Sequence, residues 1–409
     1  MHHPIYFWQL RQFHCYSCYA LGVFALMYMA IFNELPNIFF DIFIFALAFI
    51  YLFLIKNPIF KVVYSVTFGG LYFIGYSAYL IESPNYVVSM VPLLYFVIAF
   101  LIFDRYVCFN NFILIRKKLN FLIYWIFFIA GIFGILLHEA FYYVSVGVFS
   151  YIAFTERRNN FFYCALVLMF VFILLHLYNW SGFGRLNIVS SVLVVSLSYL
   201  LRHKSNVTTL NSFLFFCVAA FSTPFLSLLR FIELDANVIE LSVVLNDSAF
   251  HHLILFPEIF YKFNDFSLPS FLEQIVLFFL NWFPRTLLTV EIWSSKPIGI
   301  GYYFVDLFLS RETTGEGFSV SVGFIGELFS YLQNFWFFGY LFYIYIFILL
   351  FNFFSNFFFH RVWLLYTVSF LPSWIWGGAA LYGSRVWWFA VPFMLSCIFL
   401  RVFNSNHRR

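Results

Sequence analysis

Apolar runs long enough to cross a bilayer recur along almost the whole chain, and they constrain its fold more than any other feature. A spanning helix needs roughly 20 mostly apolar residues, and lipid cannot satisfy unpaired backbone groups, so each run predicts a helix. Only 10% of the 409 residues are charged, whereas soluble domains carry about 25%. The sequence, with a mean hydropathy of +0.91, therefore predicts an all-α polytopic membrane protein.

The apolar runs predict about twelve transmembrane helices. Residues 319–334 also have a helical pattern, but Glu327, Gln333 and Asn334 make them a poor lipid-facing span. We expect that segment to be an outer-leaflet or re-entrant helix packed inside the protein, where such segments are tolerated. The expected spans lie near 16–33, 38–55, 62–81, 85–103, 119–137, 140–155, 160–179, 186–201, 210–229, 336–356, 362–380 and 386–402.

The basic residues orient these spans. Cytoplasmic loops of membrane proteins are enriched in Lys and Arg. With both termini cytoplasmic, 15 of the 22 Lys and Arg residues lie on the inner side. The opposite orientation would place the cluster Arg116-Lys117-Lys118 outside. We therefore expect cytoplasmic N- and C-termini.

One long segment, residues 230–334, is expected on the outer side and holds twelve of the eighteen acidic residues. Its richness in Phe, Leu, Ile and Trp argues against disorder. Ser270-Phe-Leu-Glu273, after Pro269, has the form of a capping box and predicts a helix as far as Phe283, which we expect to lie along the membrane surface. The expected organisation is a nine-helix region at 1–229, a structured outer loop at 230–335 and three helices at 336–409, integrated into one membrane domain.

A series of short motifs in the outer loop resembles the oligosaccharide repeat-unit polymerases, the Wzy-type O-antigen polymerases of bacterial surface-glycan assembly. The resemblance covers residues 283–339, and elsewhere it rests on topology. It implies transfer of a growing glycan from its undecaprenyl diphosphate carrier onto the next lipid-linked unit, at the periplasmic face of the bacterial inner membrane. The motifs are Pro284-Arg285, Lys296-Pro297, Gly326-Glu327-Leu328 after Ser319 and Ser321, Asn334-Phe335 and Gly339.

Outer-side cations would suit such a reaction, because the leaving group is a diphosphate and arginine binds phosphate oxygens in bidentate fashion. We expect catalytic roles for Arg285, which lies in the Pro-Arg motif of the resemblance, and for Arg385, which is expected on the same membrane face. An outer arginine near a helix end can also simply extend to lipid phosphate. The residues expected to bind the diphosphate or the glycan are Arg230, Lys296, Arg311, Trp293 and Tyr302.

Activation of the acceptor needs a base that reaches a sugar hydroxyl. Glu327 is the first candidate, since desolvation would raise its pKa unless an arginine pairs with it. The alternative is that Glu327 is a buried structural partner of Arg285 or Arg385. His252, in the pair His251-His252, is the second candidate base. The ExD form of Glu233-Leu-Asp235 is too short a match to indicate a metal, so we expect neither metal nor cofactor.

Two other classes of function stay open. An O-antigen ligase, or another lipid-linked-sugar glycosyltransferase, would share the outer loop and the substrate. A flippase or transporter would need charges within its spans, and the first nine predicted spans hold almost none beyond Asp41. The expected partners are lipid-linked glycan donor and acceptor and membrane lipid, with a chain-length regulator as an open possibility and no nucleic acid.

Overall fold

The computed structural model describes residues 38–77, 90–107, 139–155, 159–178, 185–202, 207–233, 268–280, 321–356 and 358–387, together with 125, 128–129, 131–132, 136 and 300. Within these ranges the chain is helical almost throughout and has no strand. The all-α class predicted from the sequence is therefore confirmed for this part of the chain.

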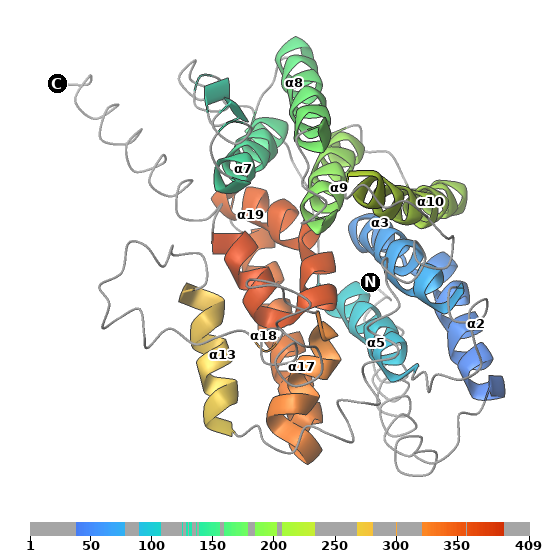
Figure 1. The fold of residues 1–409 in the computed structure, drawn as a ribbon. Helices are drawn as coiled ribbons and strands as arrows, with labels where there is room; N and C mark the ends of the chain where they lie inside the picture. Colours follow the sequence, from blue (N-terminus) through green and yellow to red (C-terminus); the bar gives the residue numbers. More distant parts are fainter. Residues whose placement is uncertain are drawn as a thin grey trace, which may run out of the picture.

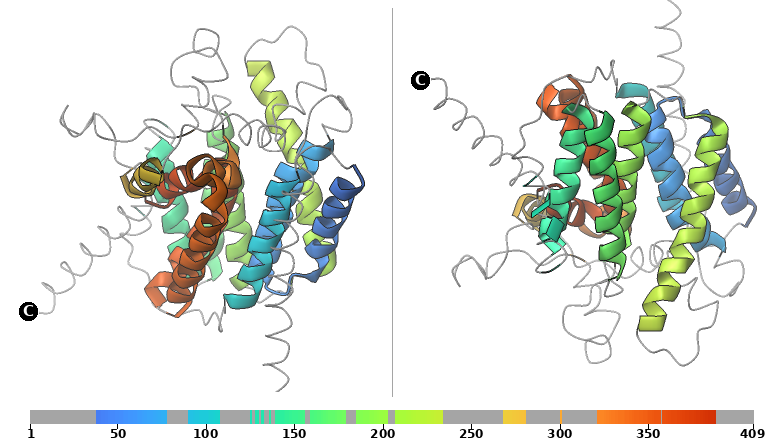
Figure 2. Two further views of the ribbon diagram at one scale, coloured as in Figure 1. Left: turned by 90° about the horizontal axis from the view of Figure 1, so that it is seen from below. Right: turned by 90° about the horizontal axis from the view of Figure 1, so that it is seen from above.

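The helices are arranged as a bundle, with most of them side by side (Figures 1 and 2). The last described helix, Leu371–Trp387, is called helix 371–387. The labelled elements are α2 (Ile38–Leu54), α3 (Pro58–Thr67), the π-helix η1 (Phe68–Phe73), α5 (Val91–Tyr106), α7 (Glu139–Thr155), α8 (Asn159–Tyr178), α9 (Arg185–Arg202), α10 (Thr209–Glu233), α13 (Leu268–Leu280), α17 (Gly323–Leu332), η4 (Gln333–Phe335), α18 (Trp336–Asn356) and α19 (Phe358–Ser369).

Three of the described helices are long and apolar enough to cross a membrane: Pro58–Ser77, Asn159–Tyr178 and Thr209–Leu229. A fourth span is possible if the bent pair Trp363–Ser369 and Leu371–Trp387 counts as one. These helices are compatible with a membrane protein. The number of twelve spans and the side on which each end lies stay predictions.

The apolar surface of α8 and α10 is the kind that faces lipid. Only 33% of the span in α8 and 28% of the span in α10 are buried, against 83% for Pro58–Ser77. Both helices lie at the edge of the bundle (Figure 1). Since an exposed apolar stripe of this length is unfavourable in water, it supports a bilayer as the solvent. The large exposed side chains of α8 include Val167, Phe170, Val171, Leu174 and Leu175.

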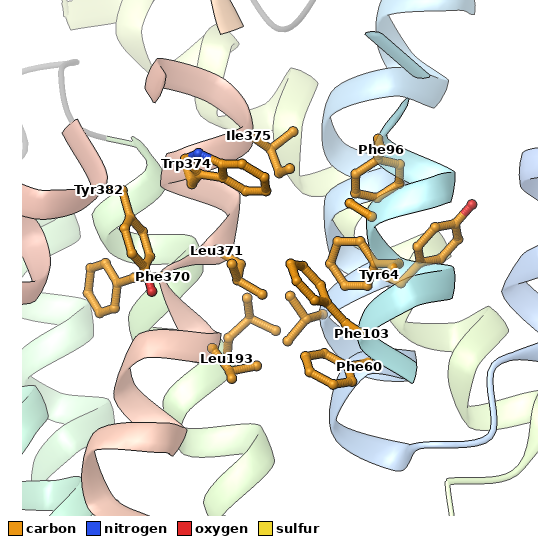
Figure 3. Packing of buried hydrophobic residues seen from close by; sticks show 14 of the residues in the cluster. Phe60, Tyr64, Phe96, Phe103, Leu193, Phe370, Leu371, Trp374, Ile375 and Tyr382 are labelled. Carbon is orange, nitrogen blue, oxygen red and sulfur yellow. The ribbon is translucent and has the colours of Figure 1, made fainter. Parts of the chain in front are cut away.

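Aromatic and aliphatic side chains fill the centre of the bundle, where α3 and α5 face α9 and helix 371–387 (Figure 3). The rings of Tyr64 and Phe96 stack at 4.8 Å between centroids, and Phe347 meets Trp374 edge-on at 4.7 Å. Such ring pairs each contribute about 0.5–1.5 kcal/mol beyond their buried area. The core thus ties the N-terminal helices to the C-terminal ones.

The contact between η1 and α10 depends on Gly69. A Cβ built at Gly69 would lie 2.5 Å from the backbone oxygen of Phe216 in α10. We expect Gly69→Ala to destabilise the fold by about 1–3 kcal/mol, because the backbone of α10 must move away. Thermal unfolding in detergent measures this. Gly70→Ala is the matched control, since its nearest neighbour is the Thr223 side chain at 3.0 Å, and an equal loss in both variants would contradict the expectation.

A sharp bend separates α19 from helix 371–387. The two axes differ by 86°, with Phe370 between them. Pro372 accounts for the break, because proline lacks an amide hydrogen and its ring clashes with the carbonyl one turn earlier. The predicted boundary between the spans 362–380 and 386–402 is therefore wrong: the break falls at Phe370, and Arg385 lies within a helix. Residues 388–402 of the second span lie outside the described residues.

Two tyrosine hydroxyls form hydrogen bonds between α19 and helix 371–387, on the two sides of the bend. The Tyr366 hydroxyl donates to the backbone oxygen of Arg385 at 3.0 Å, and the Tyr382 hydroxyl donates to that of Thr367 at 3.0 Å. Hydrogen bonds of this kind contribute about 0.5–1.5 kcal/mol each. Helix 371–387 is therefore fixed across the end of α19.

Helix α13 confirms the helix predicted from Pro269 onwards but corrects its start. It begins at Leu268, so Ser270 lies in its first turn and is not the cap that the capping-box pattern predicts. In Figure 2 α13 is seen nearly end-on, whereas α3, α5 and α10 run lengthwise. A helix that crosses the bundle direction in this way has the orientation expected of a helix at the membrane surface.

Candidate functional site

Helix α17 is buried along nearly its whole length. Every residue from Val322 to Tyr331 is buried, and the helix packs against α18, α13 and α5. It begins at Gly323 with φ +73° and is followed by Gln333 with φ 47°, a left-handed conformation that is strained for a residue other than glycine. The interior position expected for this segment agrees with these contacts.

The carboxylate of Glu327 reaches from α17 into a break in helix 371–387. Its Oε2 atom accepts a hydrogen bond of 2.7 Å from the backbone amide of Ala379, and the amide of Ala380 also stabilises the charged form. The break comes from Gly378, whose φ of +76° is readily adopted only by glycine. A Cβ at Gly378 would overlap the Glu327 carboxylate. The glycine therefore makes the space and exposes the amides that the carboxylate binds.

The environment of Glu327 is nearly dry, since the residue is only 2% exposed. Its helix has 10 residues, about 15 Å in length, and is too short to span a bilayer core of about 30 Å. Burial raises the pKa of Glu327 to about 7, and the backbone amides of Ala379 and Ala380 lower it in part. Near neutral pH both the protonated and the ionised forms are accordingly populated.

Other buried polar side-chain atoms lie on α18 and helix 371–387, the elements that α17 contacts. Among the described residues, Oε1 of Glu327 has no hydrogen-bond partner, and neither have the Tyr343 hydroxyl, the Ser373 hydroxyl and the Trp374 indole nitrogen. The Tyr343 and Trp374 rings lie 6.4 Å apart, and Phe324 lies 4.7 Å from Trp374. Tyr343 also interacts electrostatically with Glu327. Unsatisfied groups are rare in protein interiors, and Glu327 and Tyr343 are two such groups that interact. The surroundings of Glu327 are therefore a candidate site for chemistry or binding.

Helix α13 closes the other side of helix 371–387. The backbone of the two helices meets at Gly383, where a Cβ would overlap the backbone oxygen of Phe278. The rings of Phe279 and Trp387 lie 5.8 Å apart. Helix 371–387 thus lies between α17 and α13, which both come from the predicted outer loop.

Two of the predicted site residues are linked by helix 371–387: Glu327 contacts this helix from α17, and Arg385 is part of it. Glu327 binds helix 371–387 through Ala379, and Arg385 lies six residues further along that helix, partly exposed. Arg230 is in the last turns of α10, with its side chain outside the description. The predicted residues that lie outside the described ranges are Arg285, Lys296, Arg311, His252, Trp293 and Tyr302.

One hypothesis from the sequence was that Glu327 is the buried partner of an arginine. In the described part of the chain, the partner of its Oε2 is a main-chain amide. Sequence reasoning missed this partner and the aromatic residues Tyr343 and Trp374. The pair Gly377-Gly378 within an apolar helix is typical of a backbone break, and it could have indicated an exposed main-chain amide at this position.

No family model matches the chain, and comparisons with curated proteins and with solved structures also found no match. The functional argument therefore depends on the chemistry of the site and on the sequence pattern.

Proposed function

We propose that the protein polymerises polyprenyl-diphosphate-linked oligosaccharide repeat units into a surface polysaccharide, at the periplasmic face of a bacterial cytoplasmic membrane. The observation that supports this most is the buried acid Glu327 docked on the helix that carries Arg385. A carboxylate with a pKa of about 7 suits a general base at neutral pH. A nearby arginine suits a diphosphate leaving group.

In the proposed reaction, a hydroxyl of the acceptor sugar attacks the anomeric carbon of the donor glycan. The new glycosidic bond forms as the bond from that carbon to the diphosphate oxygen breaks, and the polyprenyl diphosphate leaves with the electron pair. Glu327 takes the proton of the hydroxyl on Oε1, the oxygen without a described partner. Arg385 stabilises the charge that develops on the diphosphate. Because Glu327 is covered, α17 or its neighbours must move to admit the acceptor.

The remaining predicted residues keep their roles in this proposal. Arg285 acts beside Arg385 on the diphosphate, with Arg230, Lys296 and Arg311 as further cations on the same side. Trp293 and Tyr302 would bind the glycan, and His252 is the alternative base. The reaction as proposed needs neither metal nor cofactor.

We expect Arg285→Ala and Arg385→Ala each to abolish long glycan chains while single-unit capped product remains. The reason is that each variant loses a cation that stabilises the leaving diphosphate, which is worth about 100-fold or more in rate at such sites. Gel analysis of surface glycans measures this in a strain deleted for the gene and complemented with each variant. Arg202→Ala is the control, since Arg202 binds Asn159 and the Phe162 ring at the other predicted face. Normal ladders with both site variants would contradict the mechanism.

A transporter of lipid-linked sugars is the second candidate, and the 86° bend between α19 and helix 371–387 favours it. Broken helices whose ends face polar groups are typical of substrate sites in transporters. The same deletion strain distinguishes the two functions. Loss of a flippase removes single-unit product as well, whereas loss of a polymerase leaves it.

A further inference from the structure

The two oxygens of the Glu327 carboxylate have different surroundings. Oε2 accepts the amide of Ala379 at 2.7 Å, while Oε1 is buried and has no hydrogen-bond partner among the described residues. An ionised carboxylate needs hydrogen bonds at both oxygens when it leaves water. Protonation removes the charge, and a neutral carboxyl group that lacks one hydrogen bond costs much less to bury than an ionised one that lacks it. Oε2 accepts the Ala379 amide, which leaves the other oxygen for the proton. The arrangement therefore accommodates a proton on Oε1.

Among the residues that the structure describes, the charged groups around α17 do not fix the Glu327 carboxylate in the ionised form. Asp104, at the far end of α5, accepts the backbone amides of Lys56 and Asn57, and Glu273 on α13 is exposed. Tyr343 on α18 is neutral at physiological pH. Arg385 lies on helix 371–387, six residues past Ala379 and hence about 9 Å along the axis. The main-chain amides are the groups that directly bind the carboxylate.

We propose that Glu327 is a proton-binding site in which the proton resides on Oε1 and the ionised form secures α17 to the break at Gly378. The ionised carboxylate accepts the amides of Ala379 and Ala380 strongly, since hydrogen bonds to a charged acceptor are about twice as strong as neutral ones. Protonation weakens these bonds. The carboxyl group thereby couples the position of α17 on helix 371–387 to proton uptake, whether the protein is a polymerase or a transporter.

Infrared difference spectroscopy of the full chain in lipid nanodiscs tests the proton directly. The carbonyl stretch of a protonated carboxylic acid should disappear as pH rises through about 7, well above the ordinary range of about 4.3 for glutamate. This band should be absent in Glu327→Gln. The matched control is Asp41→Asn, which removes another buried carboxyl group, 3% exposed, and should leave the Glu327 band. A spectrum of Glu327→Gln that keeps the full wild-type band, with no component lost relative to the wild type, would overturn the proposal.

Hydrogen–deuterium exchange of the segment around Ala379 tests the coupling. After correction for intrinsic exchange, the amides of Ala379 and Ala380 should gain at least several-fold protection as pH rises through 7, and Glu327→Gln should remove this dependence. Glutamine keeps an acceptor oxygen but does not titrate. If Glu327→Gln fails to fold, Glu327→Asp replaces it in the infrared experiment. The carbonyl band should then shift in frequency and not disappear. Equal protection at all pH values in the wild type would overturn the coupling. Neither readout uses glycan synthesis, so a failed polymerase assay leaves this test intact.

Discussion

Glu327→Gln should reduce the formation of long glycan chains by about 100- to 10,000-fold, the usual contribution of a general base. Glutamine has the shape of glutamate and can still accept the Ala379 amide, so folding should be largely kept. What it loses is the ability to take the proton from the acceptor hydroxyl. The measurement is the length distribution of surface glycan in the deletion strain, supported by turnover of purified protein with lipid-linked repeat units.

Glu273→Gln is the matched control for this prediction. It removes the same charge from an exposed side chain of α13, close in the fold to α17, and should leave the chain length unchanged. Turnover by the wild type should rise with pH through about 7, because the base must be ionised and the pKa of Glu327 is raised to that value. Long chains made at the normal rate by Glu327→Gln would show that Glu327 is not the base.

Gly378→Ala should have the largest effect on stability among substitutions that add one carbon. The Cβ would overlap the Glu327 carboxylate, and alanine would have to adopt a φ of +76°, which costs about 1–2 kcal/mol by itself. Displacing the carboxylate from its amides adds roughly 1–3 kcal/mol for a buried polar group that loses its partner. Thermal unfolding in detergent should therefore show a loss of about 2–5 kcal/mol.

Gly377→Ala provides the comparison at the neighbouring position. The atoms nearest to its Cβ would be those of the Leu381 side chain, whose terminal methyl can rotate away although the Leu381 Cβ would lie 3.0 Å off. The φ of Gly377 is not in the left-handed region. We expect a clearly smaller loss of stability for this variant. Similar losses of stability in the two variants would contradict the prediction. They would mean that the effect comes from packing around both glycines and not from the conformation of Gly378 or its contact with Glu327.

Most helices could be predicted because their signal is local. The apolar runs predicted at 38–55, 160–179 and 336–356 agree closely with α2, α8 and α18. The bend between α19 and helix 371–387 was harder to predict. Residues 362–380 are mostly apolar, and a hydropathy pattern does not show where a helix changes direction. Pro372 was the residue that indicated the bend, but a count of apolar residues gives too little weight to a single proline.

The candidate site could be predicted only in part. Glu327 stood out because an acid in an apolar helix is costly to bury, and the Gly-Glu motif pointed to the same residue. Its partner could not be predicted from side-chain types, since the Ala379 amide belongs to the backbone. The contribution of Tyr343 and Trp374 depends on packing between α18 and helix 371–387, which no local pattern of the sequence encodes.

The backbone partner of Glu327 has a consequence for any future comparison of related sequences. Pairs of side chains in contact tend to change together, and such correlated changes reveal contacts. Every residue except proline offers the same amide, so any substitution at positions 379 and 380 that fits the packing keeps this bond. An invariant glycine aligned with Gly378, combined with an acid aligned with Glu327, would be the signature to look for in distant relatives, even where correlated substitutions show nothing.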